Sequence, residues 1–131
     1  MKYYNYITVE KSFDETVNDV KEALKNEGFG ILSEINMQEK FKEKLDVDFR
    51  KYLILGACNP SYAHKAVNVE DKIGLMLPCN VVVQEKEKDF VEVSVIEPVV
   101  SMSGIKNKDL LLIAGELNKK LMMSLLAVKL K

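Results

Sequence analysis

The strongest constraint on the fold is a hairpin pattern in the second half of the sequence. Residues 75–85 are rich in β-forming side chains, and residues 90–96 alternate valines with Glu92 and Ser94. The two stretches are separated by the polar residues 86–89. Strands joined by so short a segment pair antiparallel, so the sequence predicts an antiparallel or mixed sheet. We expect the face that carries Glu92 and Ser94 to be turned toward water.

Apolar periodicity and helix caps predict the other elements. Strands are expected at residues 4–9, 29–35 and 50–57, and helices between Ser12 and Gly28, from Asn36 to Leu45, at 61–67 and at 108–129. Tyr4 and Tyr6 fall on one face of the first strand. Residues 52–55 are apolar on both faces, which is typical of a central strand covered on each side. The sequence therefore predicts one α+β domain over residues 1–131, in which a single sheet of about five strands has helices packed mainly on one face.

The long C-terminal helix has a wider apolar arc than a helix resting on one sheet needs. One stripe contains Leu110, Ala114, Leu117, Leu121, Leu125 and Val128, and a second contains Leu111, Met122, Leu126 and Leu130. Two interpretations fit this arc. Either the helix lies deep in the core, or part of the arc is the interface of a homodimer.

Composition and charge exclude several classes of function. The chain has 131 residues, with 19 basic and 20 acidic side chains and a net charge of -1. No overall field attracts nucleic acid or an anionic membrane, so neither is an expected partner. The N-terminus lacks the apolar segment of a signal peptide, and no apolar run approaches the roughly 20 residues that span a bilayer. These features predict a cytoplasmic protein, in which Cys58 and Cys79 are free thiols.

Two similar turns contain both cysteines and define the candidate site. The first reads Gly56-Ala57-Cys58-Asn59-Pro60, and the second reads Leu77-Pro78-Cys79-Asn80. We expect them to meet at one end of the sheet, where asparagine amides beside exposed backbone groups can recognise a small polar ligand. The predicted ligand-binding residues are Cys58, Asn59, Pro60, Pro78, Cys79 and Asn80. Asn59 has a second interpretation as a helix cap before Pro60, and Pro78 indicates a sheet edge, a bulge or a break.

The same stretches carry a family resemblance. Residues 52–60, followed by Ala63 and Ala66 and then by residues 74–83, resemble the signature of the domain of unknown function 302 family. The resemblance covers nearly the whole chain, although residues 67–73 are charged where many relatives contain proline. It implies a compact α+β fold of one sheet backed by helices, together with a tendency to form homodimers. It implies no reaction, substrate or cofactor, and the family supplies no catalytic residues to carry over.

Three kinds of chemistry are open to Cys58, His64 and Cys79. A soft metal would use these three ligands, but they lack a local chelating motif, and we predict no metal site. Thiol redox chemistry would use Cys58, whose place before a helix start can lower its pKa, with Cys79 as the resolving thiol if the Cα atoms lie within about 7 Å. A Cys-His-Asn hydrolase would add Asn59 or Asn80, without any supporting motif.

From the sequence alone, the leading hypothesis is a homodimeric small-ligand-binding or regulatory domain with its pocket at the two turns. The alternatives are a thiol-based redox or metal-dependent enzyme that uses Cys58 and Cys79, and a structural protein-interaction module. Whether the chain is an enzyme, and whether it uses a cofactor, is left open by these residues.

Overall fold

The computed structural model describes residues 2–131 and contains one five-stranded antiparallel sheet among them. The strands are β1 (Tyr4–Val9), β2 (Gly30–Asn36), β3 (Tyr52–Cys58), β4 (Cys79–Glu87) and β5 (Phe90–Ile96). Their spatial order is β1-β5-β4-β3-β2, and every neighbouring pair is antiparallel. The α+β class and the antiparallel sheet predicted from the hairpin are therefore confirmed.

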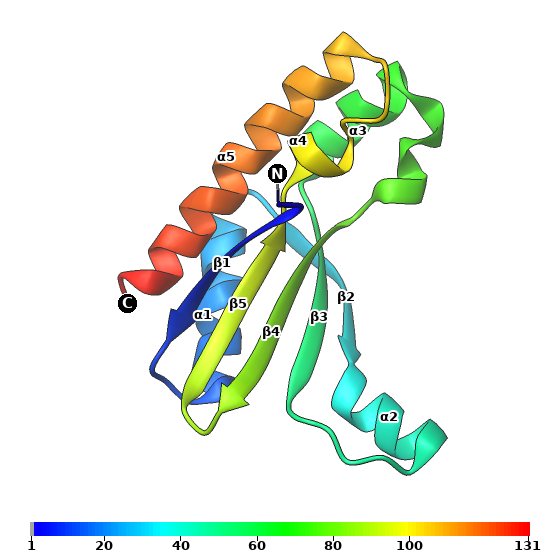
Figure 1. Ribbon diagram of the computed structural model, residues 1–131. Coiled ribbons are helices and arrows are strands. Elements are labelled where there is room, and N and C mark those ends of the chain that lie inside the picture. The colour runs from blue at the N-terminus through cyan, green and yellow to red at the C-terminus, as the bar shows by residue number, and fades with distance from the viewer. Residues whose placement is uncertain (1) are drawn as a thin grey trace.

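Helices cover one face of this sheet and extend beyond both of its ends. They are α1 (Phe13–Asn26), α2 (Met37–Leu45), α3 (Pro60–Val69), the 3-10 helix η1 (Asp71–Met76), α4 (Pro98–Ser101) and α5 (Lys108–Lys129). Figure 1 shows α1 behind the sheet, α2 beyond the lower end of β2, and α3, η1 and α4 at the opposite end. The sheet face toward the viewer carries no helix, and we call it the open face.

The core lies between the covered face of the sheet and the helices α1 and α5. Val91, Val93 and Val95 are buried there, as their alternation predicts, together with all six residues of the first α5 stripe. Met122, Leu126 and Leu130 of the second stripe are exposed, and Leu111 is partly exposed. The second stripe therefore does not belong to the core of this chain.

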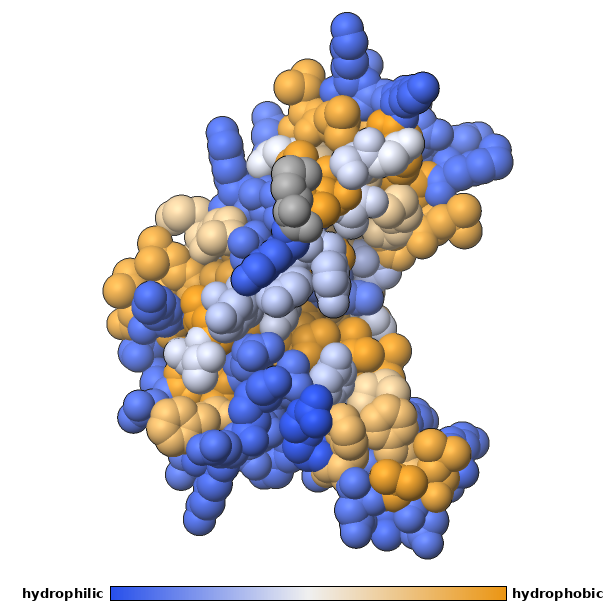
Figure 2. Space-filling view, in the orientation of Figure 1, coloured by the Kyte–Doolittle hydropathy of each residue, from blue (hydrophilic) through white to orange (hydrophobic). Residues whose placement is uncertain are grey.

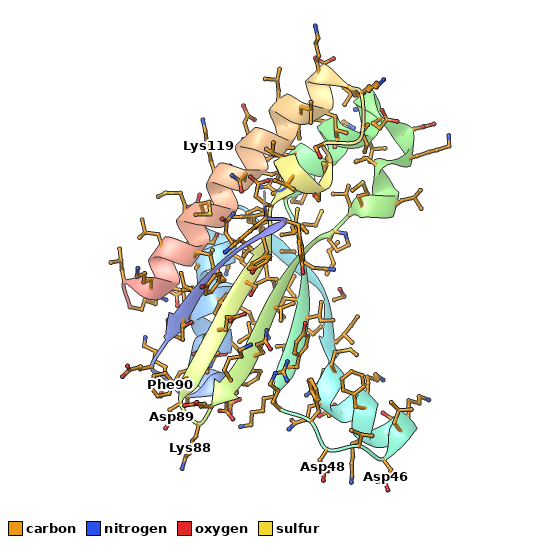
Figure 3. The ribbon with its side chains drawn as sticks, in the orientation of Figure 1. Asp46, Asp48, Lys88, Asp89, Phe90 and Lys119 are labelled. Carbon is orange, nitrogen blue, oxygen red and sulfur yellow. The ribbon has the colours of Figure 1, made fainter. Side chains whose placement is uncertain are left out.

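The predicted turns and caps are mostly confirmed. The hairpin closes through the two residues Lys88 and Asp89, and the backbone of Asp89 adopts φ 61°. Figure 3 shows both side chains at the tip of the hairpin. The side chains of Ser12, Asn36 and Asn107 each accept a hydrogen bond from the backbone N–H three residues on, at 3.1 to 3.2 Å.

Two expectations about strands are wrong. The fourth strand begins at Cys79 rather than at residue 75, because Pro78 has no N–H to extend the ladder and Leu75 lies in η1 with 88% of its surface exposed. The third strand is covered on one side only. Leu53 and Leu55 are buried beneath helices, whereas Tyr52 and Ile54 are partly exposed on the open face.

The helix α2 forms a projecting arm that buries none of its residues. It is held by contacts with the segment that returns to β3: Gln38 Nε2 donates to the carbonyl oxygen of Phe49 at 3.0 Å, and the rings of Phe41 and Phe49 lie 5.0 Å apart. At its far end Asp46 and Asp48 point away from the sheet, as Figure 3 shows, and both carboxylates pair with Lys42.

Candidate functional site

The two cysteine-containing turns meet, as the sequence predicts. In the register between β3 and β4, Gly56 is paired with Asn80 and Ala57 with Cys79. Cys58 is the last residue of β3, and it therefore lies beside the first residue of β4. The antiparallel pairing thus brings together two segments that are about 20 residues apart in sequence.

Gly56 allows the second turn to lie against the open face. A Cβ atom on Gly56 would lie 2.3 Å from the Oγ of Ser33 and 2.9 Å from the Cγ of Pro78. Both distances are far below van der Waals contact, so a side chain at this position would displace β2 or the second turn. The absence of a side chain at Gly56 therefore determines where Pro78 and Asn80 lie.

The inner side of the paired turns is nearly closed. Cys58, Asn59 and Cys79 face the helices α3 and α5 across a cavity of about 10 Å³. Its remaining walls are the side chains of Ala57, Ala63, Ala66, Leu77, Met102, Leu110, Ile113 and Leu117. A cavity of this size holds one water molecule at most. A small-molecule ligand therefore has no room on the inner side.

The groups that line this cavity have mainly structural roles. Burial, and in second place the neighbouring Cys58, raises the pKa of the Cys79 thiol to about 11, so Cys79 is neutral near pH 7. Asn59 occupies the first position before α3, but its side chain makes no cap there. Its Nδ2 donates instead to the carbonyl oxygen of Glu27 at 3.2 Å, just before Gly28, which has φ 89°. The expected cap is therefore wrong, because Asn59 ties α3 to the end of α1.

The outer side of the second turn is open. A groove of about 350 Å³, which we call the turn groove, is lined by Pro78, Cys79 and Asn80 and, across from them, by residues around α4. Asn80 is exposed, and no hydrogen bond holds its side chain within residues 2–131. The predicted ligand-binding residues are thus divided: Pro78 and Asn80 line the turn groove, Cys58 and Asn59 line the inner cavity, and Cys79 borders both.

A larger groove, which sequence reasoning missed, crosses the open face next to the turn groove. It has a volume of about 520 Å³ and is lined by Tyr3, Tyr4, Tyr6, Tyr52, Asn80, Val82, Gln84, Lys86, Glu92, Ser94, Val95 and Ile96. We call it the tyrosine groove. Figure 2 shows this side of the molecule hollowed between the end that carries α3 and α4 and the end that carries α2. Tyr4 and Tyr6 were placed on one strand face by their alternation, but nothing in the sequence placed β1 and β3 on opposite sides of one groove.

The floor of the tyrosine groove carries a hydrogen-bonded polar row. Arg50 Nε donates to Gln84 Oε1 at 2.9 Å, and Gln84 Nε2 donates to Glu92 Oε1 at 3.3 Å. The same carboxylate oxygen accepts from Ser94 Oγ at 3.1 Å, and Lys86 Nζ lies 4.0 Å from the other oxygen. The carboxylate of Glu92 is thus oriented from three sides.

Comparison with known proteins assigns the chain to a family. The family model described as "Domain of unknown function DUF302" matches residues 5–128. The chain belongs to the DUF302 family. A crystal structure of an uncharacterized conserved DUF302 protein from Bacillus stearothermophilus superimposes on it with a TM-score of 0.89 and 30% sequence identity, covering 97% of this chain and 98% of that one. None of the curated proteins matches this sequence.

In this DUF302 fold, His64 does not share the buried environment of the two cysteines. His64 is exposed on α3, where its Nε2 lies 3.4 Å from Nδ2 of Asn68, and it does not line the inner cavity. Over residues 2–131 there is no group of three or more His, Cys, Asp or Glu side chains arranged to hold a metal ion.

Pro60, the remaining predicted ligand residue, is exposed at the first position of α3 and lines neither groove. None of the helices in this same part of the chain is both long and apolar enough to cross a membrane.

Proposed function

We propose that this protein is a cytoplasmic, homodimeric small-ligand-binding or regulatory domain, and that its ligand occupies the outer rather than the inner side of the paired turns. The observation that carries this proposal is the difference in volume, about 350 Å³ in the turn groove against about 10 Å³ in the inner cavity. Sites for small molecules occupy about 300–1,000 Å³.

Asn80 is the residue best suited to hold the ligand. Its carboxamide offers both a donor and an acceptor, and it is exposed where the turn groove and the tyrosine groove join. Pro78 beside it supplies a rigid apolar wall. Together they provide the mixture of a few polar groups and apolar surface that small-molecule sites use.

Native mass spectrometry of untagged protein, purified under mild reduction, tests the proposal because one spectrum reports both stoichiometry and retained ligand. We expect a dimer that carries a small molecule, and we expect Asn80→Ala to lose that added mass. Asn68→Ala, which removes an exposed asparagine on α3, is the matched control and should keep it. Retention of the same mass by Asn80→Ala would count against the turn groove.

The homodimer has its own support in the second α5 stripe. Met122, Leu126 and Leu130 of that stripe are 40–76% exposed, and Met123 beside them is 53% exposed. An exposed apolar cluster on a helix, as in this C-terminal part of α5, is typical of an interface between proteins. We expect Leu126→Lys to convert the dimer to a monomer in sedimentation velocity. Leu32→Lys, which changes a still more exposed leucine on β2, should leave the dimer intact. Dissociation by that variant instead would place the interface elsewhere.

Thiol chemistry is the second candidate because Cys58 and Cys79 line the same cavity. In that mechanism Cys58 would be the nucleophile and Cys79 the resolving thiol. A resolving thiol must ionise to attack, and the high pKa of Cys79 disfavours this step. For this reason we rank ligand binding first.

A further inference from the structure

The two edges of the sheet differ in how they are protected from pairing with another chain. The edge strand β2 shifts register between Ile31 and Ser33, and its Glu34 carboxylate pairs with Lys21 Nζ at 2.9 Å. Bulges and charged side chains are common means of preventing strand addition at an edge. The β1 edge has neither, because its six residues pair with β5 without a register shift and none of them is charged or proline. The β1 edge is therefore open to strand addition.

The backbone groups on the free side of β1 belong to alternate residues. The carbonyl oxygen of Tyr3 accepts a hydrogen bond from the N–H of Glu97, directly after β5, at 2.7 Å. In an antiparallel ladder the N–H and C=O of one residue point to the same neighbouring strand, and those of the next residue point away from it. The groups of Tyr4, Tyr6 and Thr8 therefore point away from β5, and no strand in the described part of the chain pairs with them.

Two copies of β1 can pair with each other in a register that uses all of these groups. When Tyr6 lies opposite Tyr6 of the second copy, Tyr4 lies opposite Thr8, and each opposite pair exchanges two hydrogen bonds. Lys2 and Glu10, which lie four residues before and four residues after Tyr6, then face each other with opposite charges. The strand is thus complementary to itself about a two-fold axis, as an interface between identical copies requires.

This register keeps the helices of both copies on one side of the joined sheet. Tyr4 and Tyr6 lie on the open face, and Thr8 shares that face by alternation. Because opposite residues share a face, the open face of one copy continues into the open face of the other. The helix α5 contacts β1, and Figure 1 shows its C-terminal half beside this edge. Pairing along β1 therefore brings the exposed Met122 and Leu126 of α5 toward the same residues of the second copy.

We propose that two copies of this protein join through their β1 edges into one continuous antiparallel sheet, and that the exposed apolar cluster of α5 forms the second part of the same interface. The strand pairing satisfies the free backbone groups of β1, and the helix contact removes apolar surface from water. This inference rests on the homodimer of the proposed function. It identifies the strand, the register and the symmetry of that dimer.

Cysteine cross-linking tests the register directly. The background protein carries Cys58→Ser and Cys79→Ser, which remove both native thiols. We expect Tyr6→Cys to form a disulfide-linked dimer with copper phenanthroline in air, because opposite residues of this kind have Cα atoms about 5.5 Å apart, within disulfide range. Thr8→Cys alone should stay unlinked, because the two substituted positions lie about 13 Å apart along the strands. Mixed with Tyr4→Cys, it should form a linked heterodimer.

Amide exchange of the unsubstituted protein, followed by NMR, provides an independent measurement. The N–H groups of Ile7 and Val9 point toward β5 within one copy, whereas those of Tyr6 and Thr8 point to the free edge. In the proposed dimer all four are hydrogen-bonded, so we expect the rates of Tyr6 and Thr8 to lie within about tenfold of those of Ile7 and Val9. Fast exchange at Tyr6 and Thr8 alone would show that the edge is free in solution and overturn the inference.

The possible outcomes separate this inference from the proposed function. A dimer in sedimentation velocity whose folded Tyr6→Cys variant stays unlinked would overturn the β1 pairing and leave the homodimer standing. Self-linking by Thr8→Cys, or by the control Leu32→Cys on β2, would show another register or edge and overturn the inference as well. Circular dichroism verifies that each variant is folded, and the exchange pattern decides for any variant that is not.

A monomer in sedimentation velocity would overturn both this inference and the homodimer. The ligand would then still be decided independently by the mass that Asn80→Ala loses or keeps.

Discussion

At the scale of single residues, the two cysteines differ in their surroundings. Cys79 is buried and has a pKa of about 11, whereas Cys58 is partly exposed at the end of β3. At pH 8 a thiol with this pKa is ionised in about one molecule in a thousand, and only the thiolate is alkylated readily. We expect Cys79 in a Cys58→Ser variant to react with iodoacetamide far more slowly when folded than in urea, and to react faster as the pH rises toward 11.

The matched variant Cys79→Ser leaves Cys58 as the single thiol. We expect it to react faster than Cys79 under the same native conditions, because its side chain is more accessible. Labelling of folded Cys79 at the rate of the unfolded chain would contradict the burial described above. It would also restore thiol chemistry as a serious candidate function.

Gly56 provides a second test at the residue scale. A methyl group there meets Ser33 Oγ at 2.3 Å and Pro78 Cγ at 2.9 Å, and the proline ring cannot rotate away as the serine hydroxyl can. We expect Gly56→Ala to lower the free energy of unfolding by about 1–3 kcal/mol in urea titrations. The control Gly115→Ala meets nothing within 4 Å in α5 and should raise the free energy of unfolding by about 0.5–1 kcal/mol.

These residues also mark how far sequence reasoning reached at this scale. The two turns could be paired from their similar composition, and Asn80, predicted as a ligand-binding residue, lines both grooves. The role of Asn59 could not be predicted, because its partner Glu27 lies on a separate helix end that only the tertiary fold brings close. The division of the site into a closed inner side and an open outer side depends on Gly56 and on the packing of α5, neither of which is a local signal.

At the scale of elements, α5 is held at its start by one side chain. Asn107 accepts from the backbone N–H of Leu110 at 3.1 Å and donates to Val69 O at 2.8 Å and Glu70 Oε1 at 3.1 Å. It therefore caps α5 and fastens it to the end of α3. We expect Asn107→Ala to lower the free energy of unfolding by about 1–2 kcal/mol, measured by urea denaturation.

The comparison for this prediction is Asn36→Ala. Asn36 also caps a helix, because its side-chain oxygen accepts a hydrogen bond from Glu39 N at 3.1 Å. That helix is α2, none of whose residues is buried. Asn36→Ala should lower the global free energy of unfolding by less than about 0.5 kcal/mol, because α2 can unfold locally while the core stays folded. Equal costs for the two variants would show that α2 unfolds together with the sheet.

Elements with strong periodicity were predictable because one physical rule dominates each of them. The six apolar positions of α5 recur at helical spacing, and all six are buried. The strand predicted before Pro78 was wrong because Leu75, Met76 and Leu77 are apolar and adjacent, and strands and short helices share this pattern. Only backbone pairing with a neighbouring strand, which the sequence does not show, decides between these two structures.

At the scale of the whole molecule, stability is unevenly distributed. The sheet and the helices α1 and α5 share one core, whereas α2 projects from the end of the sheet. We expect hydrogen exchange followed by mass spectrometry to show fast exchange over residues 37–45 and slow exchange over α1 and over residues 79–96. Protection of α2 equal to that of α1 would mean that the arm is covered in solution, as it would be within a dimer that encloses it.

The order of the strands explains why the tyrosine groove was not predicted. Sequence patterns identified five strands and one hairpin, but they did not specify that β1 joins the far side of β5. Without that order, Tyr6 and Tyr52 are simply exposed residues on two unrelated strands. The groove exists because two strands, β5 and β4, lie between β1 and β3 and hold the two tyrosines at a fixed spacing.

The position of β1 at the sheet edge also determines when the sheet can finish folding during synthesis. Strands β2 to β5 lie beside one another in the order in which the ribosome makes them, so each can pair as soon as it emerges. The first strand made is the exception, because its partners are residues 91–96. Its tyrosines must wait for some eighty residues to follow, and the surface they build is therefore among the last features of the molecule to take shape.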